Sequence, residues 1–291
     1  MELRVLKYFL TIAREESISG AAQVLHLSQP TLSRQIKDME DELGKQLLIR
    51  GTRKVSLTEE GMILRKRAEE ILDLVEKTES EITVSDETVS GDIYIGTGET
   101  DSLRVILKAA KKLKEAYPDI HFHITSGDSV DISERLDKGL FDFCILMGHI
   151  DTNKYSYLNL PMKDVWGVLM PKDSYLAHKT YITPDDLFGL PLIFSRQSLK
   201  DRSLEVWFKT DYSKLNIAAT YNLLYNASLM VDEGIGYAIC YDKIINVTGN
   251  SDLCFRPLKP RLEAGMSIVW KKYQIFSKAG EKFLDILKET L

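Results

Sequence analysis

The sequence predicts an α/β protein with a helical N-terminal part, one long connecting helix and a larger C-terminal α/β part. Three observations lead to this prediction. Apolar residues recur at helical spacing through most of the first 85 residues. A polar segment, SDETVSG at residues 85–91, interrupts that pattern. Beyond it, short apolar runs typical of strands alternate with helical stretches, as they do in βαβ units.

Length and composition indicate a soluble globular protein. The 291 residues are enough for two or three domains with cores of their own, and 44% are hydrophobic and 28% charged. No apolar run approaches the ~20 residues that a membrane span needs. Charges at Glu2, Arg4 and Lys7 interrupt the N-terminal stretch, which is therefore unlike a signal peptide. We expect the protein to stay in the cytoplasm.

Residues 17–44 predict two helices joined by a short turn. Ser28 is suited to cap the second helix, Pro30 fits its first turn, and Gly44 is suited to end it. The apolar stripe of this amphipathic helix consists of Leu32, Ile36, Met39 and Leu43. The opposite face carries small, polar or basic groups at the end where a helix-turn-helix protein reaches base edges. An ordinary amphipathic helix with a solvated polar face is the alternative.

Residues 47–57 alternate on either side of Gly51-Thr52, which predicts a two-stranded wing with a basic tip. A plain hairpin with solvated Lys and Arg is the alternative. The position beside the second helix favours contact with phosphates or with the neighbouring minor groove. Residues 1–58 carry a net charge of +2 and the rest −7, so few phosphate contacts per subunit and more than one bound subunit are expected.

The segments AAQVLHLSQPTLSRQI, DELGKQLLIR and SLTEEG, within residues 9–61, closely resemble the N-terminal region of LysR-type transcriptional regulators. The match covers the helix-turn-helix without a gap, and it decides against an ordinary amphipathic helix and in favour of a helix-turn-helix, followed by a wing, that binds double-stranded DNA. Base contacts are expected from Gln29, Pro30, Ser33 and Arg34, with Thr31 in the same interface. Phosphate contacts are expected from Lys37, Arg50, Arg53 and Lys54.

Thr58, Glu59 and Glu60 predict the start of a long helix that runs to about Ser85. Its narrow apolar seam comprises Ile63, Leu64, Ala68, Ile71, Val75, Thr78 and Ile82. A helix with such a seam cannot bury itself alone, so a second copy is the expected partner. The resemblance implies antiparallel pairing of this helix, a dimer or tetramer on an inverted-repeat DNA site, and RNA polymerase as a further candidate partner. The predicted domains are 1–58, the linker helix 59–88, and 89–291.

Beyond residue 91 the alternation of strands and helices predicts a mostly parallel sheet. The chain leaves a first lobe near Pro161 and returns to it near Ser267, with strands expected at residues 166–170 and 267–270, so two crossovers and a cleft are expected. Lobe one would comprise about 89–161 and 267–291, and lobe two about 162–266. The segments GDIYIG, YPDIHF, DEGIGYAI and RPL resemble those of the family's periplasmic-binding-protein-like effector domain, which implies a small-molecule effector between the lobes.

Ligands of such sheets bind at the carboxyl ends of strands, against helix N-termini. The resemblance places a principal effector contact at residues 98–102, where Glu99 and Asp101 depart from the family pattern. One hypothesis is a zwitterion that meets Glu99 and Arg196, since Arg can take a carboxylate in bidentate fashion; ordinary helix capping by the acids is the alternative. The predicted effector-binding residues are Gly98, Glu99, Thr100, Ser102, Ser126, Gly127, Ser195, Arg196, Gln197, Asn222, Tyr225 and Asn226.

Other chemistries are less well supported. His121 and His123 alternate along one strand, but no third metal ligand is visible near them, so neither a metal nor another cofactor is expected beyond the effector. Cys144, Cys240 and Cys254 have apolar neighbours and are expected to be buried, inert thiols. A regulator of the same fold that is switched by redox chemistry or a partner remains the first alternative. An enzyme fused to a DNA-binding domain is the second, and the sequence offers no nucleophile–base pair for it.

Overall fold

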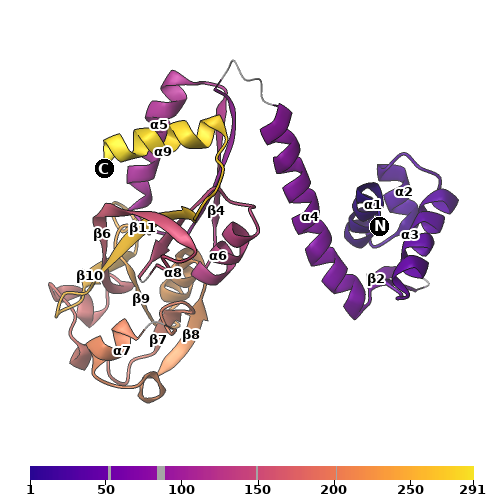
Figure 1. The fold of residues 1–291 in the computed structure, drawn as a ribbon. Coiled ribbons are helices and arrows are strands. Elements are labelled where there is room, and N and C mark those ends of the chain that lie inside the picture. The colour runs from indigo at the N-terminus through magenta and orange to yellow at the C-terminus, as the bar shows by residue number, and fades with distance from the viewer. Residues whose placement is uncertain (52–53, 84–88, 149, 201) are drawn as a thin grey trace. The chain divides into compact units, whose positions relative to one another are not determined.

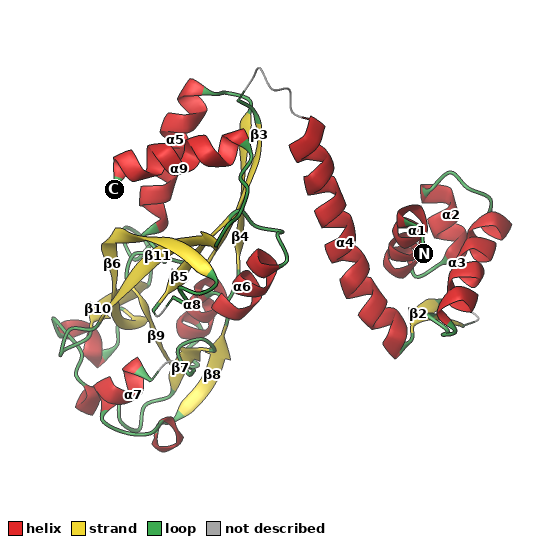
Figure 2. Ribbon diagram, viewed as in Figure 1, coloured by secondary structure: helices red, strands yellow, loops and turns green. Residues whose placement is uncertain are grey.

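The structure is a computed structural model that describes residues 1–51, 54–83, 89–148, 150–200 and 202–291. They pack as two compact units, Met1–Thr83 and Val84–Leu291. Figure 1 follows the chain through both units, and Figure 2 distinguishes their helices from their strands. Within the described ranges, no helix combines the length and the apolar character that crossing a bilayer requires.

The first unit contains the predicted helix-turn-helix and wing. Ser17 Oγ accepts the backbone N–H of Gly20 at 3.1 Å, and Ser28 Oγ accepts that of Thr31 at 3.3 Å. Gly44 ends the second of these helices at φ +64°, as predicted. The elements are α1 (Leu3–Glu15), α2 (Ile18–Val24), α3 (Gln29–Leu43), β1 (Leu48–Arg50), β2 (Val55–Leu57) and α4 (Glu59–Thr83).

Helix α3 packs through the predicted stripe except at its last position. Leu32, Ile36 and Met39 are buried, whereas Leu43 is 43% exposed. Leu43, the last residue of α3, is therefore only partly covered by the rest of the first unit. The acid Glu40 on α3 holds β1 on the helix, because its Oε1 accepts the backbone N–H groups of Leu47 at 2.7 Å and Leu48 at 3.1 Å.

Helix α4 leaves much of its apolar surface uncovered. Ala68 is fully buried against the core of the first unit, but Ile63 is 66%, Leu74 41% and Ile82 77% exposed. These three residues recur along nearly the whole length of the helix. A single copy of the first unit therefore leaves part of the α4 apolar surface uncovered: the seam residues Ile63 and Ile82, and Leu74 beside the seam.

The second unit is a mixed sheet with helices on both of its faces (Figure 2). Its strands lie in the order β4-β3-β5-β11-β6-β9-β7-β8, and β10 pairs with β6. The strands are β3 (Gly91–Thr97), β4 (Ile120–Ser126), β5 (Phe143–Met147), β6 (Tyr155–Pro171), β7 (Leu192–Ser195), β8 (Ile217–Tyr221), β9 (Tyr237–Tyr241), β10 (Leu253–Pro257) and β11 (Glu263–Lys271). The α-helices are α5 (Leu103–Ala116), α6 (Ser129–Asp137), α7 (Ser203–Phe208), α8 (Leu224–Asp232) and α9 (Lys278–Thr290).

The expectation of a mostly parallel sheet holds only within each lobe. Strand β3 runs parallel to β4 and β5, and β7 runs parallel to β8 and β9. The central strands β6 and β11 are antiparallel to each other, and also to β9 and β5 respectively. A chain that crosses to a second lobe and returns must run through the middle of the sheet in both directions, which explains the mixture.

Strands β6 and β11 begin earlier than the sequence indicated and carry the chain across both lobes. The strands expected at 166–170 and 267–270 are only parts of them. The ladder between them is regular except for a register shift between Gly265 and Ser267, and Pro161 lies between the flanking pairs Asn159–Ser267 and Lys163–Gly265. Because proline lacks an N–H to donate, this irregularity lets Pro161 lie within the strand. The short strands β8 and β10 were not predicted.

Alternate residues of each strand pack into hydrophobic cores on opposite faces of the sheet. In lobe one, Ile145 and Ile268 pack with α5 and α9, whereas Cys144 and Val269 face α6 on the other side. Lobe two repeats this arrangement: alternate β6 residues pack with α7 on one face and α8 on the other. Loops at the carboxyl ends of β3, β4, β7 and β8 therefore lead into helices that cover the sheet, and they border the cavity described next.

Candidate functional site: a helix-turn-helix surface and an interlobe cavity

The predicted DNA-binding face of α3 is open to solvent. Gln29, Pro30, Thr31, Arg34 and Lys37 are exposed, and Ser33 is half-buried. The Arg34 side chain is 83% exposed, and its Nε lies 3.9 Å from Asp38, a contact too open to hold the guanidinium in place. The exposed basic groups at this end of α3 are therefore available to a partner.

Two predicted basic residues of the wing, Arg50 and Lys54, contact residues of the helical part of the first unit. Arg50 Nη1 donates to Ser33 Oγ at 3.3 Å, so β1 and α3 present one continuous polar surface. Lys54 Nζ lies 3.1 Å from Glu16 Oε2, and the Lys54 side chain is 66% exposed. The predicted phosphate contact at Arg53 lies outside the described residues.

A cavity of about 80 Å³ lies within the second unit and is bordered by residues of both lobes. Seven predicted effector residues line it: Gly98, Glu99, Thr100, Gly127, Ser195, Gln197 and Asn222. The residues that the sequence did not indicate are Ser129, Ile132, Ile145, Leu146, Met147, Trp166, Tyr221, Leu224, Tyr241, Ile244 and Met266. Most of these are apolar or aromatic, and no chemical motif marks them in the sequence. The cavity thus has an apolar body and a polar rim.

Glu99, at the end of β3, reaches across the cavity to lobe two. Its Oε2 accepts the backbone N–H of Leu224, the first residue of α8. Leu223 occupies the N-cap position of α8 and has no side-chain acceptor, so Glu99 serves as the cap from the other lobe. A carboxylate in this place is favoured by the partial positive charge of the helix N-terminus.

A second cross-lobe contact mirrors the first. Gln197 of lobe two lies at the N-terminus of α6 in lobe one, where its Oε1 accepts the backbone N–H of Ser129 at 3.4 Å. Asp128 caps the following N–H groups, those of Val130 at 2.9 Å and Asp131 at 3.0 Å. Each lobe therefore supplies a side-chain acceptor to a helix of the other lobe.

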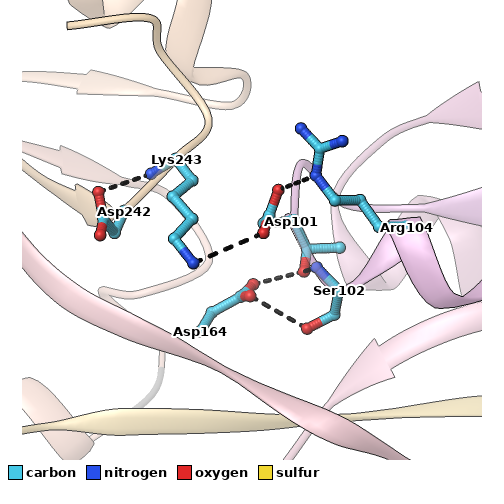
Figure 3. Close-up of polar contacts among 7 residues, drawn as sticks. Asp101, Ser102, Arg104, Asp164, Asp242 and Lys243 are labelled. Carbon is cyan, nitrogen blue, oxygen red and sulfur yellow. Dashed lines mark hydrogen bonds and ion pairs between the residues drawn. The ribbon is translucent and has the colours of Figure 1, made fainter. Parts of the chain in front are cut away.

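The loop between β3 and α5 is fastened to β6 by a buried acid, Asp164, that the sequence did not single out. Thr100 Oγ1 donates to Asp164 Oδ2, and Ser102 Oγ donates to Asp164 Oδ1 at 3.0 Å. The Ser102 N–H in turn donates to Thr100 Oγ1 at 3.0 Å. Asp164 is only 4% exposed, and its one available signal was an acid inside an apolar strand, KDVWGVLM. Figure 3 shows Ser102 and Asp164 facing each other.

Asp101 of the same loop links the lobes by charge. Its Oδ1 accepts from Arg104 Nε at 2.6 Å, and its Oδ2 lies 3.9 Å from Lys243 Nζ of lobe two. Figure 3 shows Asp101 between these two cations, and Asp242 accepting the Lys243 backbone N–H. Asp101 does not line the cavity.

We predict that Asp164 makes the second unit less stable as pH rises above about 4. Burial raises the pKa of Asp164, and the Thr100 and Ser102 hydroxyls lower it by less. The unfolded chain therefore loses its proton first, near the ordinary Asp pKa of about 3.9. The free energy of unfolding falls from there until folded Asp164 also ionises.

The Asp164→Asn variant should lack this contribution, so its stability relative to wild type should improve as pH rises through that window. Urea midpoints from tryptophan fluorescence measure the difference, because Trp166, Trp207 and Trp270 all lie in the second unit. A difference between the two proteins that stays constant over pH 4 to 7 would contradict the prediction.

Five predicted effector residues lie off the cavity. Ser102 is buried on Asp164, and Ser126 is exposed at the end of β4. Arg196 is exposed, Tyr225 is 64% exposed and Asn226 points to solvent as well. None of them is among the lining residues. Arg196 is exposed and is not among the residues that line the cavity, whereas Glu99 lines it and contacts α8, so the pairing of Glu99 and Arg196 on one ligand stays a prediction.

The thiols and the histidines do not add a reactive centre to this part of the structure. Cys144, Cys240 and Cys254 are buried and unpaired with one another, and burial raises the pKa of each. His123 Nε2 lies 2.8 Å from Asp92 Oδ1, and its ring stacks on Tyr94. Among the described residues, no three potential metal ligands come together.

Comparison with known proteins gives consistent matches along the chain. Residues 3–62 match the bacterial regulatory helix-turn-helix protein model of the lysR family, and residues 86–291 match the LysR substrate binding domain. The HTH-type transcriptional regulator BsdA of Bacillus subtilis (strain 168) is 34% identical over 197 residues, 67% of each chain. The Hca operon transcriptional activator HcaR of Escherichia coli (strain K12) is 28% identical over 298 residues, covering 100% of this chain and 98% of that one.

Solved structures agree in fold. The crystal structure of CbnR, a LysR family transcriptional regulator, matches with a TM-score of 0.79 over 100% of this chain and 99% of that one. The two sequences are 18% identical, so this match concerns the fold alone.

Proposed function

Because the chain belongs to the LysR family of DNA-binding transcriptional regulators, we propose that it controls transcription in response to a small molecule bound in the interlobe cavity. The cavity bordered by both lobes is the observation that supports this proposal. A ligand that contacts both lobes would stabilise an arrangement in which the lobes are closed on it over one in which they are open. That change would shift the population of DNA-binding geometries. The predicted domains, 1–58, 59–88 and 89–291, would divide DNA binding, linkage and effector binding among them.

We assign DNA reading to the exposed face of α3. Gln29, Pro30, Thr31, Ser33 and Arg34 would meet base edges in the major groove, since they lie at the N-terminal end of the second helix of the motif. Lys37, Arg50, Arg53 and Lys54 would neutralise phosphates on either side. The Arg50–Ser33 contact supports this division, because it fixes the wing beside the reading helix.

The exposed seam of α4 supports a homodimer, or a tetramer built from two dimers. Ile63, Leu74 and Ile82 remain exposed in one copy, and a second α4 helix would cover them. Two recognition helices related by a two-fold axis would then read an inverted repeat. Sedimentation of the full chain as a monomer at micromolar concentration would contradict this assembly.

RNA polymerase at a neighbouring promoter is the further proposed partner. The proposed location is the cytoplasm, where both the DNA and RNA polymerase lie.

The effector proposal is tested with the full chain and a panel of metabolites, amino acids and small organic acids and bases. A true effector at about 100 times its Kd should stabilise the second unit by about 2.7 kcal/mol, seen as a higher urea midpoint in tryptophan fluorescence. The same compound should change the footprint of the protein on its DNA site. A compound that stabilises the protein without changing its DNA complex, or a panel without any stabilising compound, would argue against an effector-gated regulator.

The alternative of redox switching receives no support from the thiols. A reactive cysteine needs access and thiolate character, whereas Cys144, Cys240 and Cys254 are buried and the pKa of each is raised. The alternative of a catalytic second unit is disfavoured by family membership, because the family consists of regulators.

A further inference from the structure

We propose that the interlobe cavity selects small organic cations, amines with a short apolar body, over carboxylates. This inference rests on the proposed effector site and names the class of ligand that fits it. Among the described residues that line the cavity, Glu99 bears the only charge; no Lys, Arg or His is present there. Glu99 forms no ion pair with any described residue, so only the partial positive charge at the N-terminus of α8 opposes its full negative charge. The cavity is thus a negative site.

The helix N–H groups that would bind a carboxylate ligand already donate to side chains of the protein. The first N–H of α8 donates to Glu99, and the first N–H of α6 donates to Gln197. Helix N-termini are the usual anion sites of such a cleft. A carboxylate ligand would have to displace Glu99 from α8 and remain close to its charge, whereas an ammonium group would leave that contact in place.

The hydroxyl groups around the cavity also favour a donor over an acceptor. Thr100 donates to Asp164, Tyr221 donates to the Ile239 carbonyl at 2.9 Å, and Tyr241 donates to Met147 Sδ. The protons of these three hydroxyl groups are therefore committed within the protein and are not offered to a carboxylate, which can only accept. The remaining polar side chains of the lining, those of Ser129, Ser195, Gln197 and Asn222, are neutral and carry both donors and acceptors, so they serve either kind of ligand and do not discriminate between charges.

The remaining lining suits the body of a small amine. Trp166 and Tyr241 lie with ring centroids 4.2 Å apart, and aromatic rings attract a cation through their electron-rich faces. The aliphatic side chains Ile132, Ile145 and Met266 supply the apolar wall. At about 80 Å³ the cavity is roughly half the ~150 Å³ that accommodates benzene, so the buried part of the ligand is a few carbon atoms.

Three probes with one carbon skeleton test the inference: isobutylamine, isobutyl alcohol and isobutyrate, titrated calorimetrically into the full chain. The amine should bind at least 10-fold more tightly than the acid, equivalent to about 1.4 kcal/mol, with the alcohol between them. In Glu99→Gln, whose amide oxygen can still accept the Leu224 N–H, the preference of the amine over the acid should disappear. The matched control Asp232→Asn removes one exposed acid of α8 outside the cavity and should keep the wild-type order.

The outcomes separate this inference from the proposed function. Isobutyrate binding as tightly as the amine, or a preference for the amine that survives in Glu99→Gln, overturns the cation inference and leaves an effector site standing. Absence of binding by all three probes also overturns the cation inference. The effector proposal is contradicted only if no compound of the wider metabolite panel stabilises the protein either. Equal loss of preference in Asp232→Asn would show that net charge, rather than Glu99, sets the order, and would overturn the inference.

Discussion

The Arg34→Ala variant is expected to bind its specific DNA more weakly by about 1–3 kcal/mol for each recognition helix, and to lose discrimination at one base pair per half-site. Arginine near the start of a helix in the major groove most often pairs with guanine O6 and N7. The Arg34 side chain is 83% exposed, and its Nε lies 3.9 Å from Asp38. Such a long, solvent-exposed ion pair contributes little to the free energy of folding. The loss should therefore appear in DNA affinity and leave the free energy of unfolding unchanged.

Two further variants make this prediction specific. Lys37→Ala should weaken binding about equally for all sequences and reduce the salt slope of binding by about one, as expected for a phosphate contact. Arg4→Ala should have no effect, because Arg4 pairs with Glu2 at the N-terminus of α1, and the neighbouring Met1 amine contacts Glu42 at the far end of α3. Fluorescence anisotropy on specific and scrambled duplexes measures all three. Equal weakening on both duplexes in Arg34→Ala would mean that Arg34 contacts phosphate instead.

The Gly167→Ala variant is expected to destabilise the second unit by about 3 kcal/mol, the upper end of the range for overpacking. Gly167 lies on β6 between β9 and β10, where it pairs with Cys240 and Pro257. A Cβ atom there would lie 2.1 Å from Phe255 Cζ and 2.5 Å from the Arg256 carbonyl oxygen. The phenyl ring can rotate, but the carbonyl belongs to the sheet and cannot move without breaking the ladder.

Gly265→Ala is the matched control on the neighbouring central strand, β11. No atom lies within 4 Å of the Cβ that it would introduce, so we expect a change between zero and a gain of about 1 kcal/mol from the restricted unfolded chain. Urea unfolding followed by tryptophan fluorescence reports the second unit in both variants, because its signal comes from Trp166, Trp207 and Trp270. Similar urea midpoints for the two variants would contradict the prediction, because they would mean that β10 shifts at Phe255 and Arg256 to make room for the added methyl group.

The helix-turn-helix illustrates what local sequence determines. The caps at Ser28 and Gly44 and the stripe of Leu32, Ile36 and Met39 depend on neighbours within about four residues, so their spacing alone predicts them. Leu43 has the same period, but its 43% exposure at the end of α3 depends on which elements pack there, which spacing does not predict.

The cavity illustrates the limit of that information. The turn at residues 98–102 could be predicted because strand ends that precede helices have local signatures. Asp164, Trp166 and Tyr241 could not, because residues far apart in the sequence meet there only after β6 has crossed between the lobes. Arg196 lies between Ser195 and Gln197, which both line the cavity, but it is itself exposed and outside the lining, a difference that its place in the sequence does not indicate.

Sequence by itself determined the recognition helix with its polar face, the wing, the two lobes and most strands and helices of the second unit, since periodicity, caps and turn residues act over a few positions. Tertiary structure alone decided which acids matter and how. Glu99 caps α8 from the other lobe, Asp164 holds Thr100 and Ser102, and Arg196 is not among the residues that line the cavity. Charge and hydrogen bonding act through space over a few ångströms, and only the folded sheet brings those groups within that distance.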